Sequence, residues 1–188
     1  MNLPADPRIE TTRLSLRLLE IGDLPDLMQV NGDATVTRYL PYKCWADPAD
    51  ATAWYERMVA GHAAGNWLQF VLILRSTQRV IGTCLVFHFD EPSARAEVGY
   101  VLAHGHWGAG LMHEAMAGVT AFAFEQLGSR RLEAEIDPRN TASAQLLDRL
   151  GFVKEGLLRE RWVGKGELTD SALYGLLRAD WLAGPKAT

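Results

Sequence analysis

The feature that most constrains this chain is a glycine-rich segment, HGHWGAG, at residues 104–110. It follows a predicted strand over Glu97 to Leu102 and precedes the longest predicted helix, which runs from Leu111 to Leu127. The first amides of a helix have no partner within it, so this N-terminus is predicted to attract an anion such as phosphate. Gly108 and Gly110 carry no side chain, and a pyrophosphate could therefore approach their backbone closely.

Two common phosphate-binding motifs do not fit this segment. A dinucleotide fingerprint requires a glycine at position 113, where the chain has His113, and no strand–helix–strand unit opens the chain. A nucleotide phosphate loop read from Gly105 requires Lys followed by Ser or Thr, but Leu111 and Met112 occupy those places. We therefore do not expect a Rossmann dehydrogenase or an NTPase.

Periodicity along the chain predicts an α/β fold with a mixed sheet and helices packed on it. Strands are predicted over Arg13–Leu19, Leu68–Leu74, Val80–Phe89, Glu97–Leu102, Arg131–Ile136, Phe152–Val163 and Ser171–Leu177. Further helices are predicted over Asp23–Val30, from Asp47-Pro48 through Val59, and over Asn140–Leu150. The 188 residues fit one domain, predicted to span residues 1–188.

Composition excludes several classes of protein. A net charge of -4 provides no basic field for nucleic acid, and 48% hydrophobic with 22% charged residues is ordinary globular usage. The first residues lack the pattern of a signal peptide, and no apolar run approaches the roughly 18 residues of a membrane span. A cytoplasmic protein with no membrane partner is expected. Cys44 and Cys84 lie in no zinc-ligand spacing, so two reduced thiols are expected.

Four motifs in a consistent order resemble one family. They read AEVGYVL, HWGAGLMHEA, RLEAEIDPRNTASAQLLDRLGFVKEG and GKGELTDSALYGLL, and the opening ETTRLSLRLL extends the likeness to nearly the whole chain. Together they resemble the GNAT superfamily of N-acetyltransferases, within it the group of ribosomal-protein N-terminal alanine and serine acetyltransferases. The resemblance implies a mixed sheet of about seven strands with two splayed parallel central strands, flanked by about four helices.

The resemblance also implies an activity and a donor site. The expected activity is direct transfer of acetyl from acetyl-CoA to a primary amine, such as a protein N-terminal amine. Acetylation of an antibiotic or polyamine, and a module that binds acyl-CoA without turnover, remain open alternatives, as does a homodimer. The residues that the resemblance assigns to acetyl-CoA are Tyr100, Val101, Leu102, Trp107, Gly108, Ala109, Gly110, Leu111, Met112, Asn140 and Ser143.

Glu97 is the first candidate for the general base. On a strand it shares a face with Gly99 and Val101, beside the expected acetyl position. The alternative is a surface glutamate, or a structural one that is ion-paired with an arginine such as Arg95 or Arg131. Glu133 and Glu135 alternate with apolar residues on a neighbouring strand, so one or both are expected to be solvated. Either is instead a second candidate for the base.

Ser143 is the candidate group for the leaving thiolate. Asn140 and Ser143 form an N-x-x-S helix start, which also suits plain capping. Similar enzymes carry a tyrosine acid where this chain has Leu147, so either Ser143 or solvent protonates the thiolate. Gly105 is a second departure, because many relatives have Gln or Arg there.

Three aromatic residues in the segment RYLPYKCW, Tyr39, Tyr42 and Trp45, are predicted to form an acceptor wall, although such segments also pack against helices. No metal is expected: His104, His106 and His113 have no further ligand at a recognised spacing. A covalent acetyl-cysteine is disfavoured, because neither cysteine has an activating neighbour in the sequence.

Overall fold

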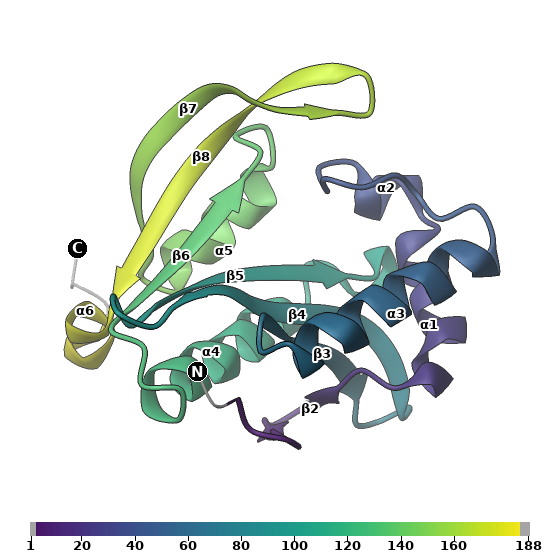
Figure 1. The fold of residues 1–188 in the computed structure, drawn as a ribbon, viewed down its shortest axis with the longest axis horizontal. Coiled ribbons are helices and arrows are strands. Elements are labelled where there is room, and N and C mark those ends of the chain that lie inside the picture. The colour runs from purple at the N-terminus through teal and green to yellow at the C-terminus, as the bar shows by residue number, and fades with distance from the viewer. Residues whose placement is uncertain (1–2, 185–188) are drawn as a thin grey trace.

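One mixed sheet organises the protein, as described by a computed structural model of residues 3–184 (Figure 1). The sheet has eight strands in the order β1-β2-β3-β4-β5-β6-β8-β7, and all neighbours are antiparallel except β5 and β6. The strands are β1 (Ile9–Glu10), β2 (Leu14–Leu18), β3 (Trp67–Leu74), β4 (Arg79–Asp90), β5 (Arg95–Leu102), β6 (Arg131–Ile136), β7 (Val153–Gly164) and β8 (Glu167–Leu177). The predicted domain of residues 1–188 includes four C-terminal and two N-terminal residues that lie outside this description.

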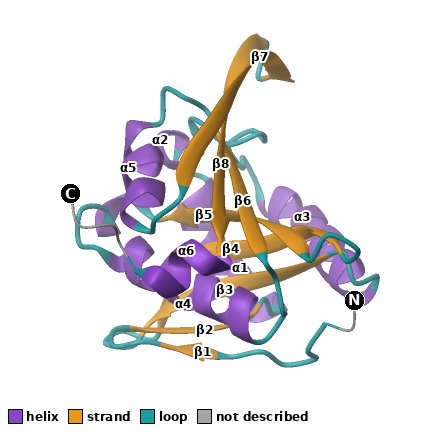
Figure 2. Ribbon diagram, turned by 90° about the vertical axis from the view of Figure 1, so that its left-hand side faces the viewer, coloured by secondary structure: helices purple, strands orange, loops and turns teal. Residues whose placement is uncertain are grey.

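Helices cover both faces of the sheet (Figure 2). They are α1 (Leu24–Asn31), α2 (Ala34–Thr37), α3 (Pro48–Ala63), α4 (Leu111–Glu125), α5 (Thr141–Arg149) and α6 (Arg178–Ala183), with 3-10 turns η1 (Ile21–Asp23) and η2 (His104–His106). Helices α4 and α5 pack with the larger apolar cluster, whereas α1 and α3 pack with the smaller one.

Strand β3 shows why the sheet is a central layer. Its sequence WLQFVLIL is almost continuously apolar, as expected for a strand buried on both faces. Phe70 and Leu72 belong to the cluster under α4, and Val71 between them belongs to the cluster under α3. Because successive side chains of a strand point to opposite faces, one apolar run fills both cores.

The central strands β5 and β6 pair over a short distance only. Their parallel register covers three pairs, from Arg95 opposite Arg131 to Glu97 opposite Glu133. Beyond that point β5 stays paired with β4 as far as Leu102, while β6 stays paired with β8. The two strands therefore separate, which confirms the predicted splayed pair.

The short elements were missed by periodicity. The two-residue strand β1, the four-residue helix α2 and the six-residue helix α6 were not predicted, so the sheet has eight strands rather than seven and six α-helices rather than four occur in residues 3–184. Such short segments span too little of a period to be recognised. Helix α4 ends at Glu125, two residues before the predicted Leu127. No helix in the described part of the chain is long and apolar enough to span a membrane.

We expect Gly82→Ala to destabilise the fold, because Gly82 lies against the backbone of β5. An added Cβ would sit 2.2 Å from the carbonyl oxygen of Val101, and backbone cannot move aside as a side-chain end can. Overpacking of this kind costs about 1–3 kcal/mol. Thermal unfolding should show a drop of several degrees for Gly82→Ala. Gly156→Ala in β7 is the control, since no atom lies within 4 Å of its added Cβ, and an equal drop in both variants would contradict the close approach.

Candidate functional site

The separation of β5 from β6 leaves backbone groups of β5 without a strand partner. Ala103 donates its amide to the carbonyl of Ile81 in the β4 direction. Because amides alternate along a strand, the amide of Val101 also faces β4, whereas those of Tyr100 and Leu102 face the opening toward β6. Three amides of β5 were predicted to bind acetyl-CoA. Those of Tyr100 and Leu102 face the expected position of the donor between β5 and β6, and that of Val101 does not.

The glycine segment presents free amides at the far end of β5. Gly108 and Gly110 both have φ of +73°, a left-handed conformation that favours glycine. Within residues 3–184, the amides of Gly108, Ala109 and Gly110 donate no hydrogen bond to the protein. The first amides of α4 are also unpaired, as at every helix N-terminus. The predicted site differs at Trp107, whose amide is already bound to the carbonyl of His104.

Arg13 braces this segment, a role that no pattern in the sequence predicted. Its guanidinium donates to the carbonyl of Ala109 at 2.9 Å and to the carboxylate of Glu114 at 2.6 Å. Glu114 also accepts bonds from Thr11 and from the backbone amide of Arg13. These bonds tie the segment just before β2 to the start of α4, and they fix the Ala109 carbonyl so that its peptide cannot rotate freely.

Helix α5 and strand β5 bring two hydroxyl groups together, those of Ser143 and Tyr100. The side chain of Asn140 accepts a bond from the amide of Ser143, which is ordinary N-capping. The hydroxyl oxygens of Ser143 and Tyr100 lie 2.5 Å apart, and burial raises the pKa of Tyr100. Leu147, one turn further on, is fully buried in the core. The hydroxyl beside Ser143 is thus supplied by β5, a contact that spacing along the chain could not reveal.

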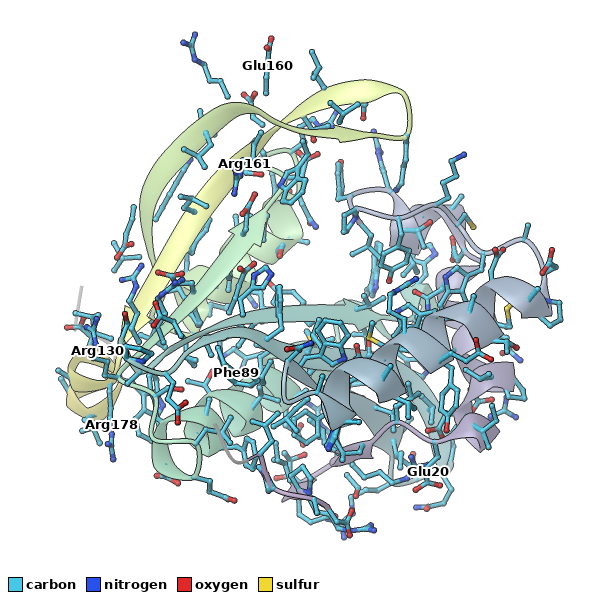
Figure 3. The ribbon with its side chains drawn as sticks, in the orientation of Figure 1. Glu20, Phe89, Arg130, Glu160, Arg161 and Arg178 are labelled. Atoms are coloured by element: carbon cyan, nitrogen blue, oxygen red, sulfur yellow. The ribbon has the colours of Figure 1, made fainter. Side chains whose placement is uncertain are left out.

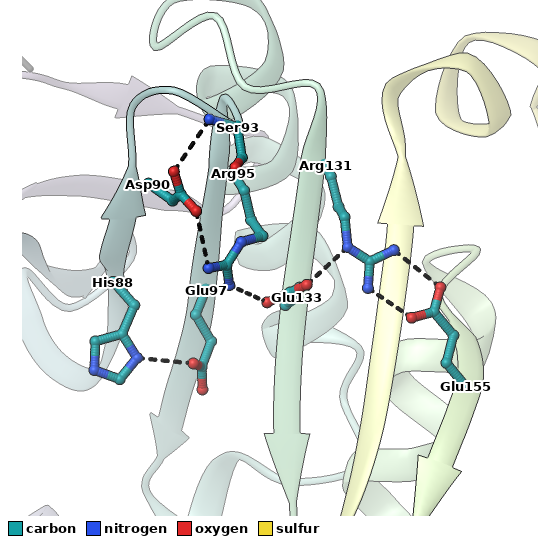
Figure 4. Close-up of polar contacts among 8 residues, drawn as sticks. All are labelled: His88, Asp90, Ser93, Arg95, Glu97, Arg131, Glu133 and Glu155. Carbon is teal, nitrogen blue, oxygen red and sulfur yellow. Dashed lines mark hydrogen bonds and ion pairs between the residues drawn. The ribbon is translucent and has the colours of Figure 1, made fainter.

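Glu97 lies where β5 and β6 begin to separate. Its side chain is 18% exposed, and His88 Nδ1 lies 2.9 Å from its carboxylate (Figure 4). Burial raises the pKa of Glu97, and this effect outweighs the opposing effect of His88. In residues 3–184 neither Arg95 nor Arg131, the arginines expected to pair with a structural Glu97, binds it; both bind Glu133 instead.

The other two candidate bases are occupied. Glu133 binds Arg95 at 2.6 Å and Arg131 at 2.8 Å (Figure 4). Burial alone would raise the pKa of Glu133, but its bonds to these arginines lower it below its usual value. Glu135 accepts a bond from the indole of Trp162 and lies 3.6 Å from Arg161. The two arginines make Glu133 a weaker proton acceptor, whereas no arginine binds Glu97 in the described residues.

The β7–β8 hairpin and the segment after α2 approach each other across the opening. Lys165 at the hairpin turn donates to the carbonyls of Thr37 and Arg38. On the same hairpin, Glu160 points outward while Arg161 lies on the side of β6 (Figure 3). The hairpin and the segment 38–45 therefore border the opening from opposite sides.

The predicted acceptor wall is only partly exposed. Trp45 is 8% exposed and packs against Trp54 in the smaller core, which removes it from the wall. Tyr42 donates its hydroxyl to the side chain of Asn31, and burial raises the pKa of Tyr42. Tyr39 lies near the guanidinium groups of Arg38 and Arg139, at 5.2 and 5.9 Å from its ring centre. Of the three predicted wall residues, Tyr39 is the strongest remaining candidate for contact with the acceptor.

The histidines and cysteines in the described residues form no metal-binding cluster. His104 pairs with Asp33 at 3.8 Å, and no cluster of three or more His, Cys, Asp or Glu suited to a metal occurs in the described residues. Cys84 is buried, and burial raises the pKa of its thiol, which makes it a poor nucleophile. Cys44 is half-buried and its thiol is free.

A surface hollow of about 300 Å³ lies elsewhere, between α3 and β2, with Tyr55, Met58 and His62 among its lining residues. None of its lining residues belongs to β5 or β6. The residues described above therefore lie where β5 and β6 stop pairing, and not around this hollow. An extended ligand between the two strands would bring an anionic end to the amides of the glycine segment.

Comparisons with known proteins agree with this geometry. A family model described as acetyltransferase (GNAT) domain matches residues 13–153. The chain is 36% identical to the uncharacterized N-acetyltransferase p20 of Bacillus licheniformis, over 91% of this chain and 96% of that protein. It is 30% identical to the [ribosomal protein uS5]-alanine N-acetyltransferase of Escherichia coli, over 65% of this chain and 64% of that protein. The structure of spermidine N-acetyltransferase from Vibrio cholerae in complex with CoA and spermine shares the fold, with TM-score 0.80, 21% identity and coverage of 91% and 99%.

The opposite environments of Glu97 and Glu133 predict opposite effects on stability. The raised pKa of Glu97 means that folding is penalised once pH rises above the pKa of an unfolded glutamate and through that of the folded one. The lowered pKa of Glu133 means that its ion pairs stabilise the fold above the unfolded value and are lost as pH falls through the folded one. At pH 7, Glu97→Gln should raise the melting temperature and Glu133→Gln should lower it.

Thermal unfolding followed from pH 7 down to pH 3 checks this prediction. Both differences should shrink in acid, where glutamates are protonated in the folded and unfolded chains alike. The two variants control for each other, because each replaces a glutamate on the same face of the sheet by glutamine. A lower melting temperature for Glu97→Gln at pH 7 would contradict the burial of an ionised Glu97.

Proposed function

The chain belongs to the GNAT acetyltransferase family, and on this premise we propose that it binds acetyl-CoA between β5 and β6 and transfers the acetyl group directly to a primary amine. The family uses acetyl-CoA as its acetyl donor, and the named relatives are N-acetyltransferases. The observation that carries the proposal is the separation of β5 from β6 directly after Glu97 and Glu133. It leaves a gap with free amides at one end and a carboxylate at the other.

The residues of the gap suit the two ends of the donor. The left-handed glycines and the unpaired amides from Gly108 to Met112 would hold the pyrophosphate at the start of α4. The amides of Tyr100 and Leu102 would bind the pantetheine and the acetyl oxygen, where they stabilise charge that develops on that oxygen. Arg13, which holds the carbonyl of Ala109, would keep this loop in its binding conformation.

Glu97 would accept the proton of the attacking amine. Aminolysis of a thioester requires a neutral amine, and a carboxylate with a raised pKa is a better acceptor than an ordinary one. Glu133 and Glu135 are held by arginines and by Trp162, which supports Glu97 over both. The proton passes from the amine nitrogen to the Glu97 carboxylate as the new amide bond forms and the thioester bond breaks.

Ser143 would stabilise or protonate the leaving thiolate. Its hydroxyl lies at the N-terminal turn of α5 on the side of Tyr100, and a bond between the two hydroxyls orients it. A hydroxyl there can donate a hydrogen bond to the thiolate or deliver its proton, with solvent as the alternative donor. Tyr100 thereby compensates in part for the absence of a tyrosine at Leu147.

A protein N-terminal amine is the proposed acceptor. Support comes from the similarity to the uS5-alanine N-acetyltransferase. A polyamine is the second candidate, because the spermidine acetyltransferase shares the fold. Measuring thiol release with an N-terminal-alanine peptide, an N-terminal-serine peptide and spermidine as acceptors distinguishes the two.

Acetyl-CoA and CoA should raise the melting temperature, because a ligand that binds only the native state stabilises it. Gly108→Ala should weaken this binding in calorimetry, since a side chain disfavours the left-handed conformation of the loop. Gly128→Ala is the matched control: Gly128 has a similar φ of +70° and an equally open surrounding, but lies at the far end of α4. Equal affinity of the two variants for acetyl-CoA, or a melting temperature that neither acetyl-CoA nor CoA raises, would contradict the proposed donor site.

Glu97→Gln and Ser143→Ala should differ in their kinetics. Positioned proton transfer contributes roughly 10² to 10⁴-fold, so Glu97→Gln should lower kcat by that order with acetyl-CoA affinity nearly unchanged. The loss should shrink at high pH, where the free amine is abundant. Ser143→Ala should lower kcat without such rescue, because it acts on the thiolate. Full activity of folded Glu97→Gln at neutral pH would exclude Glu97 as the base.

A further inference from the structure

A bulge in β4 places His88 beside Glu97. The register between β4 and β5 shifts between Phe87, which is opposite Glu97, and Asp90, which is opposite Arg95. Two residues of β4, His88 and Phe89, therefore lie opposite one residue of β5. His88 has φ of +49°, a left-handed conformation that is rare for residues other than glycine, though histidine is among the more tolerant.

The bulge decides which face of the sheet His88 occupies. Val86 belongs to the core under α4, so in a regular strand His88 would point into the same apolar core. The extra residue lets Phe89 take that core position (Figure 3), and His88 turns to the face of Phe87 and Glu97. The rings of Phe87 and His88 lie 4.4 Å apart. Left-handed strain at a bulge is typical of functional sites, where it redirects one side chain.

We propose that His88 carries the amine proton away from Glu97 to solvent after each acetyl transfer. The inference rests on the proposed role of Glu97 as the base. The side chain of Glu97 is 18% exposed and that of His88 is 69% exposed, so the ring spans the distance from the half-buried carboxylate to water. An imidazole can accept a proton on one nitrogen and release one from the other.

The proton balance of this relay is complete. While Glu97 is ionised it can only accept hydrogen bonds, so the Nδ1–H of His88 donates to it at 2.9 Å. When the carboxylate takes the amine proton, the His88 ring reorients so that its unprotonated nitrogen receives that proton, and its other nitrogen then releases a proton to water. Glu97 returns to its ionised state, and no other reactant is needed.

The charged groups near Glu97 lie on three strands. Burial raises the pKa of Glu97, His88 on β4 lowers it, and Glu135 and Glu133 on β6 raise it. Arg95 lies on the same strand as Glu97 but is bound to Glu133 and Asp90 (Figure 4). Within residues 3–184, the ring of His88 is thus the only group whose side chain is hydrogen-bonded to the Glu97 carboxylate.

Two substitutions at His88 test the relay. His88→Asn keeps a hydrogen-bond donor and suits the left-handed conformation, but it cannot carry a proton. His88→Gly also fits this conformation and leaves room for a free imidazole. With spermidine and an N-terminal-alanine peptide as acceptors, both variants should lower kcat about 10-fold or more, with KM for acetyl-CoA unchanged. Added imidazole should restore His88→Gly more than His88→Asn.

The double variant with Glu97→Gln separates this inference from the proposed function. Once Glu97 can no longer be the base, His88→Asn should cause no further loss, as expected for residues that act in one pathway. Wild-type kcat in His88→Asn, or a loss that imidazole does not rescue in folded His88→Gly, would overturn the relay while leaving Glu97 as the base. Full activity of Glu97→Gln would instead overturn the role of Glu97 and the relay together.

Discussion

The short parallel contact between β5 and β6 is the constraint on which the rest of the structure depends. Three register pairs join the strands, and each then follows its antiparallel neighbour on the other side. The unpaired amides of Tyr100 and Leu102 exist because of this divergence. Buried amides without a partner are costly, so an opening of this kind is stable where a ligand or water satisfies them. The architecture thus builds a binding site out of an incomplete sheet.

A network of ion pairs secures the point where the strands divide. Arg95 and Arg131 hold Glu133 between them, and Arg131 also binds Glu155 of β7 (Figure 4). This network joins β5, β6 and β7 across the junction. Glu97 and Glu133 lie opposite each other in register but differ in pKa. The arginines lower the pKa of Glu133, whereas burial raises that of Glu97. One junction therefore contains a structural glutamate and a glutamate suited to proton transfer.

Sequence patterns predicted most of the fold because its central elements are long and strongly periodic. The boundaries of β6 agree with the prediction, and those of α4 and β2 differ by one or two residues. The pattern at Asn140 and Ser143 predicted a capped helix start, which the structure shows. Trp45 was predicted to face the acceptor but is buried. The sequence around an aromatic residue between two helices is the same whether its side chain packs inward or faces a ligand.

The sequence by itself determined the family, the order of the main elements and the glycine segment before α4. Those features are local, since they depend on periodicity, on helix termini and on residues within one motif. Only the tertiary structure decided which glutamate is free of arginines, that Arg13 braces the segment 104–110, and that Tyr100 meets Ser143. It also decided which face of the sheet His88 occupies, because one extra residue in β4 turns its side chain to the opposite face. These contacts join residues distant in sequence, and their geometry follows from strand register, which no single segment encodes.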